Sequence, residues 1–261
     1  MQLMINSIQF AYKTRRAWWF TASSRTRERF ARTTLGSFWL GLSNLLSIGA
    51  LAFVYGAVFK VEDFRSYVVY LGIGLVTWNT IAGAIGSAPS LLRTNAENIK
   101  NTNIDPIFYT MEEWSFQVQT FAQSFGLVLL ALTIINHSLL INFATAGIIP
   151  LINLLLFIYW FPLIICLVGA NYEDFFQLIP IAVQLMFLLS PILYNKEALG
   201  SVSWTATFNP IFRILSIFRN SIISGEVNIS YSMLLLIGNL MGVVIAINQL
   251  AKKRKILPFM L

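Results

Sequence analysis

The sequence of 261 residues predicts an all-α fold, a polytopic membrane protein with six transmembrane helices, an N-terminal amphipathic interfacial helix and short re-entrant outer helices between spans five and six. Hydrophobic residues make up 57% of the chain and charged residues 11%, whereas soluble domains contain roughly 45–50% and about 25%. Mean hydropathy is +0.70, and long uncharged segments recur along the chain. This composition excludes a soluble enzyme and predicts several membrane crossings.

Each predicted span is an apolar segment near the length of about 20 residues that a helix needs to cross a hydrocarbon core of roughly 30 Å. The polar turn Asn136-His137-Ser138 divides the longest uncharged segment into spans three and four. Pro180 and Pro191 are expected to kink span five or break it near its ends, because proline lacks a backbone donor. The predicted spans are residues 33–59, 66–92, 114–136, 143–168, 175–195 and 227–251.

The basic residues predict the orientation of these spans. Lys and Arg number 18 against 11 Asp and Glu, a net charge of +7 that is concentrated at the two ends of the chain. With both termini in the cytoplasm, thirteen of the 18 lie on the inner side and five on the outer side. The positive-inside rule therefore favours a single transmembrane domain, residues 1–261, with both termini cytoplasmic.

Two further segments are not expected to cross the membrane. Residues 10–32 mix aromatic residues with seven Lys and Arg, a composition typical of a helix lying in the inner interface. Residues 198–225 are apolar, but Gly200, Asn209-Pro210, Arg213 and Arg219 divide them into short pieces. We expect these pieces to form re-entrant or interfacial helices on the outer face.

Few residues suit catalysis or ion coupling. The glycine pair with the spacing of a phosphate-binding loop, Gly36 and Gly41, is followed by Leu42 rather than by the required Lys, so an ATPase would have to be a separate chain. The predicted spans contain no Asp, Glu, Lys or Arg, which argues against a proton-coupled antiporter or a charge-lined channel. The single cysteine, Cys166, allows no intrachain disulfide and no cysteine-based metal site.

Two acidic pairs leave a second class of function open. Glu112-Glu113 and Glu173-Asp174 lie at the inner edges of predicted spans and have the chemistry of a general acid and base in a membrane-embedded glycosyl or acyl transferase. Adjacent residues on a helix point about 100° apart, so neither pair converges by itself. Solvated or loop-ordering carboxylates are the favoured interpretation.

Aromatic residues, 14% of the chain, are frequent in or beside predicted spans one and five. Their faces can stack on the apolar faces of sugar rings, and Tyr and Trp add hydrogen bonds. They are candidates for a glycan path, although most membrane aromatics serve as interfacial belts or in packing. The candidate lining residues are Phe38, Trp39, Phe53, Tyr55, Phe59, Phe187 and Tyr194.

Three blocks of residues carry a resemblance to a known family. The first is Arg32-Thr-Thr-Leu35-Gly36-Ser37-Phe38-Trp39, the second comprises Glu173-Asp174-Phe175, Gln177, Pro180, Gln184 and Ser190-Pro191-Ile192-Leu193-Tyr194, and the third is Asn209-Pro210, Arg219 and Gly225. Together they resemble the permease subunit of type 2 ABC exporters of polysaccharides, which carry O-antigen, capsular polysaccharide or teichoic acid. Two departures are Ser37, where the family often has Pro, and Glu173, where it often has a basic residue.

The resemblance implies a transport subunit with no catalytic residue, cofactor or metal of its own. Two copies of the chain would pair with two ATPase subunits that bind ATP and magnesium. Spans one and five of both copies would form the route for a lipid-linked polysaccharide of the undecaprenyl-diphosphate type, with O-antigen favoured. The chain would lie among the lipids of the bacterial inner membrane and bind no nucleic acid. An ABC exporter of a drug or a small lipid is the alternative within transport.

The resemblance also implies roles for three groups of residues. The loop 93–110 would supply the coupling helix for the ATPase, through Arg93, Asn95, Glu97, Asn98, Lys100 and Asp105. Four arginines would lie near the pyrophosphate of the lipid carrier, because guanidinium groups bind phosphate bidentately; they are Arg25, Arg27, Arg29 and Arg32. Positive-inside anchoring is the other explanation for them. Asn209, Pro210, Arg213 and Arg219 would belong to re-entrant helices that close the outer side of the channel.

Overall fold

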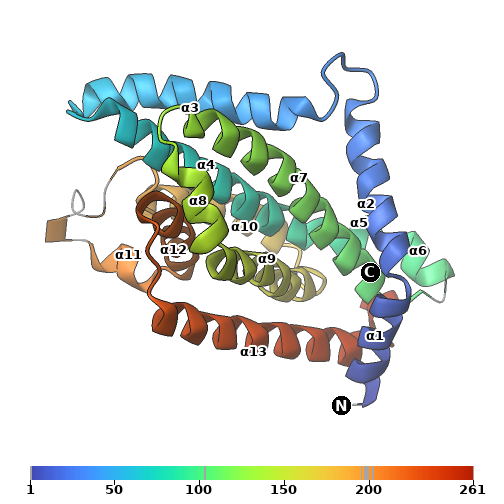
Figure 1. The fold of residues 1–261 in the computed structure, drawn as a ribbon. Helices are drawn as coiled ribbons and strands as arrows, with labels where there is room; N and C mark the ends of the chain where they lie inside the picture. The colour runs from blue at the N-terminus through green and yellow to red at the C-terminus, as the bar shows by residue number, and fades with distance from the viewer. Residues whose placement is uncertain (1, 103, 195, 197–199, 202, 261) are drawn as a thin grey trace.

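The computed structural model describes residues 2–260 apart from 103, 195, 197–199 and 202 (Figure 1). All regular structure in this part of the chain is helical, which confirms the predicted all-α fold. The helices are α1 (Gln2–Lys13), α2 (Arg15–Phe30), α3 (Phe38–Val58), α4 (Phe64–Ser87), η1 (Ala88–Ser90), α5 (Leu91–Thr94), α6 (Ala96–Asn101), α7 (Ile107–Thr133), α8 (Ser138–Thr145), α9 (Ile148–Gly169), α10 (Phe175–Leu189), α11 (Trp204–Phe208), α12 (Pro210–Ser224), α13 (Ile229–Lys253) and α14 (Leu257–Met260).

Five helical segments among the described residues are long and apolar enough to cross a membrane: α3, α4 continued to Thr94, α7, α9 and α13. The helix expected as span five, α10, has 15 residues, which is about 22 Å at 1.5 Å per residue. It ends at Leu189 rather than at residue 195, because Ser190 is extended, as a residue before proline prefers to be. The polytopic character is confirmed, and the sixth crossing stays a prediction.

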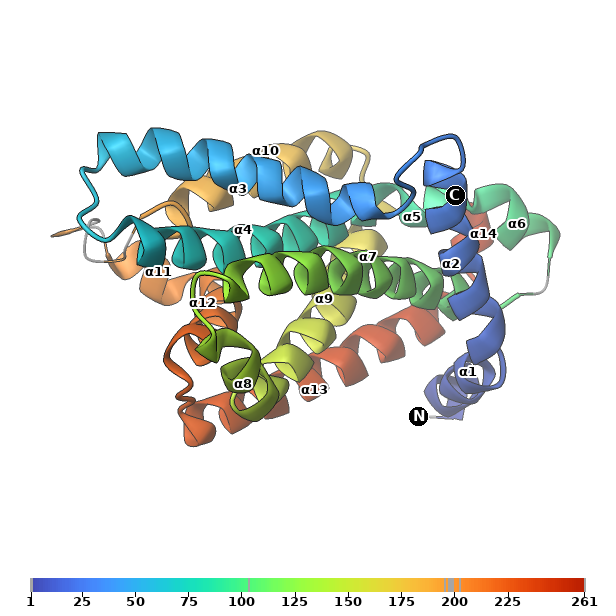
Figure 2. The same cartoon turned by 45° about the horizontal axis from the view of Figure 1, so that its top comes forward.

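The central helix of the bundle is α4, which contacts α3, α7, α9, α10 and α12. Of its most apolar window 72% is buried, against 17% for α3. Gly72 allows the close approach of α7, since a Cβ there would lie 2.9 Å from the Leu132 side chain. In Figure 2 both α3 and α10 run along the upper side of the molecule, next to α4. One side of each is therefore left without a partner in the single chain.

The opposite side of the bundle is closed by α9 and α13 (Figure 1). The Trp160 indole lies over Gly242, where a Cβ would come within 2.6 Å of the ring. Its N–H donates to Asn239 Oδ1 (2.9 Å), and Asn239 Nδ2 donates to Asn153 Oδ1 (2.8 Å). These hydrogen bonds satisfy amide groups that would otherwise be buried without partners in apolar surroundings.

The N-terminal segment differs from the single interfacial helix expected over residues 10–32. It forms two helices that break at Thr14, whose hydroxyl donates to the Phe10 carbonyl (2.8 Å). The indole N–H of Trp18 donates to the Ala11 carbonyl across the break (2.9 Å). Helix α2 packs along the first half of α7, and Figure 1 places both chain termini at this end of the molecule. We call it the α2 end, and the opposite end, with the turn from α3 to α4, the α3–α4 end.

The segment expected to be divided by four interruptions contains one long helix in its described part. The break at Asn209-Pro210 lies where it was predicted, between α11 and α12. The Asn209 side chain caps α12 by accepting from the Ile211 and Phe212 amides, and proline at the first helical position needs no donor. The expectation that Arg213 and Arg219 interrupt the helix was wrong, because both side chains are accommodated by partners outside α12: Arg213 Nε donates to the Thr207 carbonyl and Arg219 Nη1 to the Pro191 carbonyl.

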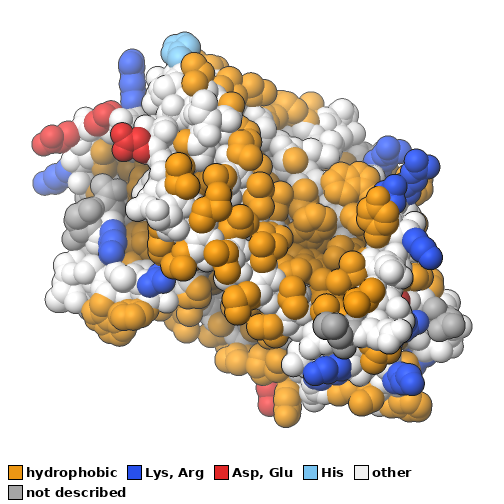
Figure 3. Space-filling view, turned by 60° about the horizontal axis from the view of Figure 1, so that its bottom comes forward, with side chains coloured by type: hydrophobic (Ala, Val, Ile, Leu, Met, Phe, Trp, Pro, Cys, Tyr) orange, Lys and Arg blue, Asp and Glu red, His pale blue; other side chains and the backbone are white. Residues whose placement is uncertain are grey.

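The surface agrees with a membrane-embedded chain. Figure 3 shows hydrophobic side chains over most of one face, with Lys, Arg, Asp and Glu gathered mainly towards opposite margins. Such a broad apolar field exceeds what water-soluble monomers expose. The charged margins correspond to the water-facing ends of a membrane protein.

Candidate functional site

The unpartnered sides of α3 and α10, and the exposed Asn79 of α4 beside them, carry polar groups as well as apolar ones. Asn79 of α4 donates through Nδ2 to Asn44 Oδ1 of α3 (2.8 Å), and Asn44 Nδ2 donates to the Leu40 carbonyl (2.7 Å). Further exposed polar side chains in these helices are Ser43, Ser47, Gln177 and Gln184. Exposed amides are unfavourable against lipid tails. This surface, which we call the polar strip, therefore suits a water-filled path or a polar ligand better than lipid.

A polar cavity of 360 Å³ lies at the α2 end, where the chain turns from α2 into α3. Helix α2, the turn and α7 supply its walls, which are Ser23, Thr26, Arg27, Phe30, Gly36, Ser37, Gln119 and Gln123. Gly36 has φ +54°, a conformation that glycine adopts without strain. We call this space the Arg27 cavity.

The Arg27 cavity has the chemistry of an anion site. Within the described residues no ion pair includes Arg27, whose exposed guanidinium keeps its donors available. Ser37 directly precedes α3, a helix of 21 residues whose positive dipole end lies here, although its first three amides donate to the Leu35, Gly36 and Ser37 carbonyls. The Ser23 and Thr26 hydroxyls donate to the Trp19 and Ala22 carbonyls, so the donors that suit a phosphate group are the Arg27 guanidinium, the Ser37 hydroxyl and the Gln123 amide. The volume of 360 Å³ lies within the usual range of ligand pockets.

Arg25, two residues away, is used differently. Its Nη1 lies 2.6 Å from Glu113 Oε2 and 3.4 Å from Glu112 Oε1, and its guanidinium lies over the Phe116 ring at 4.0 Å. Burial lowers the pKa of Arg25, but the charges and hydrogen bonds of Glu113 and Glu112 outweigh it and raise the pKa above its ordinary value. Arg25 thus fixes α2 on α7, while Arg27, Arg29 and Arg32 stay exposed for anionic groups.

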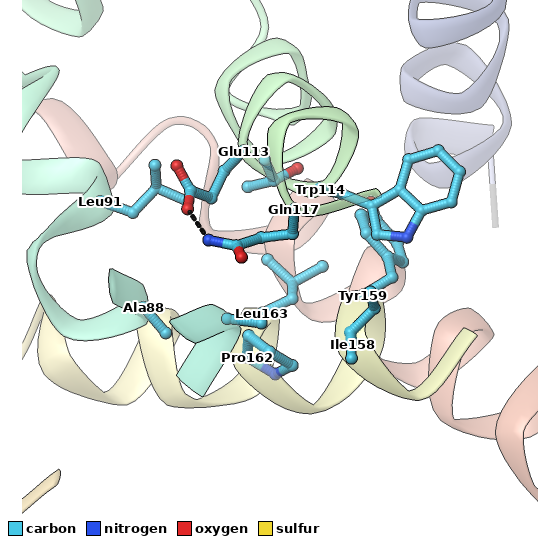
Figure 4. A pocket seen from close by; sticks show the side chains of 11 residues that line it. Ala88, Leu91, Glu113, Trp114, Gln117, Ile158, Tyr159, Pro162 and Leu163 are labelled. Atoms are coloured by element: carbon cyan, nitrogen blue, oxygen red, sulfur yellow. Dashed lines mark hydrogen bonds between the residues drawn. The ribbon is translucent and has the colours of Figure 1, made fainter. Parts of the chain in front are cut away.

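The expectation of solvated carboxylates was wrong for Glu112 and Glu113, which are each 7% exposed. The reason is that α7 begins at Ile107, earlier than residue 114, so both side chains fall inside a packed helix. Glu113 Oε1 accepts from Gln117 Nε2 at 2.8 Å (Figure 4) and from Ser87 Oγ, also at 2.8 Å. The cavity beside Glu113 has a volume of 20 Å³, enough for about one water molecule.

These contacts give the acidic pairs structural roles. The Glu113 carboxylate accepts hydrogen bonds from Arg25, Ser87 and Gln117. The cavity beside it, of 20 Å³, has no room for a sugar or acyl donor. Glu173, by contrast, is exposed and pairs with Arg93 (2.7 Å). The two pairs thus bind different arginines, Glu112 and Glu113 binding Arg25 and Glu173 binding Arg93.

The loop expected to contact an ATPase contains the short helix α6. Its exposed side carries Glu97, Asn98 and Lys100, while Ile99 is buried. Asn95 Nδ2 donates to the Leu91 carbonyl (2.9 Å), and Arg93 is held by Glu173. The polar side of α6 is thus open to another protein.

Asp105, expected in the same contact surface, lies inside the chain with 1% exposed. It accepts from Ser7 Oγ of α1 (2.9 Å) and from the Ile107 amide, and it pairs with Arg254 (2.9 Å). Its carboxylate ties both terminal segments to the start of α7. No local pattern around Asp105 indicates this role, because its partners Ser7 and Arg254 lie about a hundred and a hundred and fifty residues away.

The second and third sequence blocks meet at the α3–α4 end. Arg219 Nη1 donates to the Pro191 carbonyl (3.0 Å), and its guanidinium lies 3.6 Å from the centre of the Tyr70 ring. Asn209 Nδ2 donates to Ser190 Oγ (2.9 Å). Arg219 is 2% exposed, whereas Arg213 is half-buried and donates to the Thr207 carbonyl (2.7 Å). The end of α10 and the start of α12 are thereby fixed on α4.

The candidate aromatic residues divide into groups. Phe38, Trp39 and Phe53 are exposed on α3, the last of them 75%. Tyr55 stacks on Phe59 with ring centres 5.6 Å apart. Phe187 packs on Trp78 of α4 at 5.6 Å. The seventh candidate, Tyr194, joins Phe59 at a further cavity.

This cavity, of 570 Å³, lies beside the α3–α4 turn and is called the Tyr70 cavity. Its lining residues are Phe59, Val61, Asp63, Ser66, Tyr67, Tyr70, Tyr194 and Ile223. The sequence analysis missed the contributors from α4. The sequence does contain a pattern that could have indicated them. Tyr67 and Tyr70 are three residues apart, about one helical turn, near the start of the helix that Asp63 caps.

Comparison with known proteins decides the family. The family described as ABC-2 type transporter matches residues 20–223. The chain belongs to this family. It is thus a multi-pass membrane permease of an ABC transporter, is not itself the ATPase, and works with an ATPase partner.

Two relatives of this ABC-2 permease are both O-antigen export system permease protein RfbA of Klebsiella pneumoniae. One is 22% identical over 208 residues, covering 78% of this chain and 79% of the relative. The other is 21% identical over 212 residues, covering 81% and 82%. They confirm the family to which the three sequence blocks pointed.

Proposed function

We propose that this ABC-2 permease exports a lipid-linked polysaccharide of the O-antigen type across the bacterial inner membrane. Two copies of the chain and two ATPase subunits, which bind ATP and magnesium, would form the transporter. Both termini and the Arg27 cavity would lie on the cytoplasmic side. The carrier would be a lipid of the undecaprenyl-diphosphate type.

The observation that carries this proposal is the pairing of the Arg27 cavity with the polar strip. A lipid-linked glycan presents a phosphate at the membrane interface and a long hydroxylated chain. The Arg27 cavity supplies arginine and hydroxyl donors beside the start of α3. The polar strip then continues with Asn44 of α3 and Asn79 of α4, where purely lipid-facing helices would be apolar. The two relatives, both named as O-antigen export permeases, support this cargo.

The proposed coupling to the ATPase uses the polar side of α6. Glu97, Asn98 and Lys100 are exposed, and the buried Ile99 fixes the helix to the rest of the chain. Movement of the ATPase would reach α4 through the continuous helical segment from Phe64 to Thr94. Since α4 contacts both α3 and α10, this path connects the ATPase to the polar strip.

Depletion of the chain in its host tests the proposal. Lipid-linked polymer should accumulate on the cytoplasmic side, where an externally added glycosidase does not reach it, and expression of the wild-type chain should restore its surface display. The tagged chain should co-purify with an ATPase subunit. Normal surface polysaccharide after depletion would contradict the proposed cargo, and increased drug sensitivity with normal polysaccharide would point to a small-molecule exporter.

A further inference from the structure

The Tyr70 cavity differs chemically from the Arg27 cavity. Four of its eight lining residues are aromatic: Phe59, Tyr67, Tyr70 and Tyr194. Phe59 is 46% exposed and is supported on its other side by Tyr55. One face of Tyr70 is covered by the Arg219 guanidinium. The aromatic surface is thus held in place by contacts behind it.

Hydrogen bonds fix the tyrosine hydroxyls of the Tyr70 cavity. Tyr67 Oη donates to the Leu193 carbonyl (2.8 Å), and Tyr194 Oη donates to the Leu188 carbonyl (2.6 Å). Tyr70 Oη lies 3.1 Å and 3.0 Å from the carbonyl oxygens of Pro191 and Tyr194. With their hydrogens donated to the backbone, the Tyr67 and Tyr194 oxygens offer acceptor lone pairs to a ligand.

Asp63 adds a carboxylate at the rim. It accepts from the Ser66 amide (3.1 Å) and the Ser66 hydroxyl (2.6 Å), and these hydrogen bonds lower its pKa. A carboxylate has about four lone-pair positions, so two remain for a ligand. An adjoining cavity of 270 Å³ shares Asp63, Ser66 and Ile223 and is also lined by Arg65 and Asn136.

We infer that the Tyr70 cavity binds a sugar unit of the polymer at the exit of the route. Its acceptors match the many O–H donors of a sugar, and its rings match the apolar faces of a pyranose. The Asp63 carboxylate disfavours a phosphate, and the adjoining cavity extends the site to a second unit. A volume of 570 Å³ is in the range of small-molecule sites. The inference rests on the proposed function for the identity of the polymer.

Thiol protection tests the inference on the complete permease–ATPase complex in nanodiscs. Val61→Cys places a thiol in the wall of the cavity, and Glu62→Cys places one on the next residue, which does not line it. Cys166 is 1% exposed and does not compete for a polar maleimide. The probe is a short neutral oligosaccharide released from the surface polysaccharide of the host strain by mild acid.

Labelling at position 61 should become about fivefold slower at a probe concentration about four times its Kd, while labelling at position 62 stays unchanged. Phe59→Leu and Asp63→Asn should each remove most of the protection, and Asn at position 63 still caps α4. The matched controls are Phe64→Leu and Glu62→Gln, which should leave the protection at position 61 unchanged because neither residue lines the cavity.

Equal labelling with and without the oligosaccharide would overturn the inference. Protection by a free fatty acid but not by the oligosaccharide would also overturn it and make the space a lipid site. The result is independent of the depletion experiment. If depletion blocks export and protection is absent, only the sugar site fails; if depletion leaves export intact, the proposed function fails.

Discussion

The two ends of α3 carry cavities of opposite chemistry. The Arg27 cavity at its start is lined by an arginine, hydroxyls and amides, whereas the Tyr70 cavity beyond its end is lined by rings and acceptors. The 21 residues of α3 separate them by about 32 Å, close to the thickness of a hydrocarbon core. A lipid-linked glycan is equally two-sided, anionic at its carrier and neutral along its sugars. The difference suggests that each cavity serves one part of such a substrate.

A buried or half-buried arginine stabilises each end in a different way. At the α2 end Arg25 pairs with two carboxylates, Glu112 and Glu113. At the α3–α4 end Arg219 is 2% exposed and uses the neutral Pro191 carbonyl and the Tyr70 ring. Loss of the arginine should therefore have different consequences at the two ends, and this comparison yields the following predictions.

The largest effect on stability is expected from Arg219→Leu. The Pro191 carbonyl would lose its charged donor and a buried side chain would fit poorly, which should cost about 2–4 kcal/mol. This loss of stability is measured by thermal unfolding in detergent, with the exposure of the buried Cys166 thiol as the readout. Arg213→Leu, at a half-buried site on the same helix, is the control and should unfold closer to the wild-type temperature, because Arg213 is more exposed than Arg219. Equal unfolding of both variants would show that Arg219 does not hold this end together.

The next effect concerns binding rather than stability. Arg27→Ala should weaken binding of a lipid diphosphate roughly tenfold or more, since a charged hydrogen bond contributes about 1.5–3 kcal/mol. The unfolding temperature should not change, because Arg27 is exposed and forms no ion pair among the described residues. Arg16→Ala, on the same helix but away from the cavity, should bind normally. A titration with labelled undecaprenyl diphosphate compares them, and equal affinities would contradict the anion site.

A smaller loss of stability is expected from Glu113→Gln. The amide has the shape of the carboxylate but loses its charge against Arg25 and directs a donor at one of its present donors. The cost should be about 1–3 kcal/mol, measured by the same thiol assay. Glu28→Gln, at an exposed position on α2, provides the matched control. An unfolding temperature for Glu113→Gln as high as that control would mean that solvent screens the pair with Arg25.

The smallest effect is expected at the exposed ion pair between Glu173 and Arg93, in which the Glu173 side chain is 79% exposed. Glu173→Gln should change stability by less than about 1 kcal/mol, because exposed pairs are screened by water and salt. A large drop in unfolding temperature would show that this pair fixes α10 on η1 and α5. ATPase coupling measured on the same variant would then separate stability from transport.

The sequence predicted the features that depend on composition or on neighbouring residues. Apolar segments predicted the membrane helices, and Asn209-Pro210 predicted the start of α12, because a cap and a first-turn proline act locally. Contacts between distant residues could not be predicted in this way. Arg25 meets Glu113 across 88 positions, and Arg219 meets Pro191 across 28. The residues predicted to bind anions therefore included Arg25, although it is paired with carboxylates. Of the residues that line the Tyr70 cavity, only Phe59 and Tyr194 were among the predicted lining residues.

Photo-crosslinking from the two cavities tests the central claim most directly. A benzophenone amino acid at Gln123, in the Arg27 cavity, or at Ile223, in the Tyr70 cavity, is introduced into the ATP-trapped complex with lipid-linked oligosaccharide. Leu234, 65% exposed on α13, serves as the lipid-facing control. We predict that mass spectrometry finds the lipid diphosphate part attached at position 123 and the sugar part at position 223. The account would be contradicted if the same part of the substrate were attached at positions 123 and 223. It would also be contradicted if crosslinking at both positions did not exceed that at position 234.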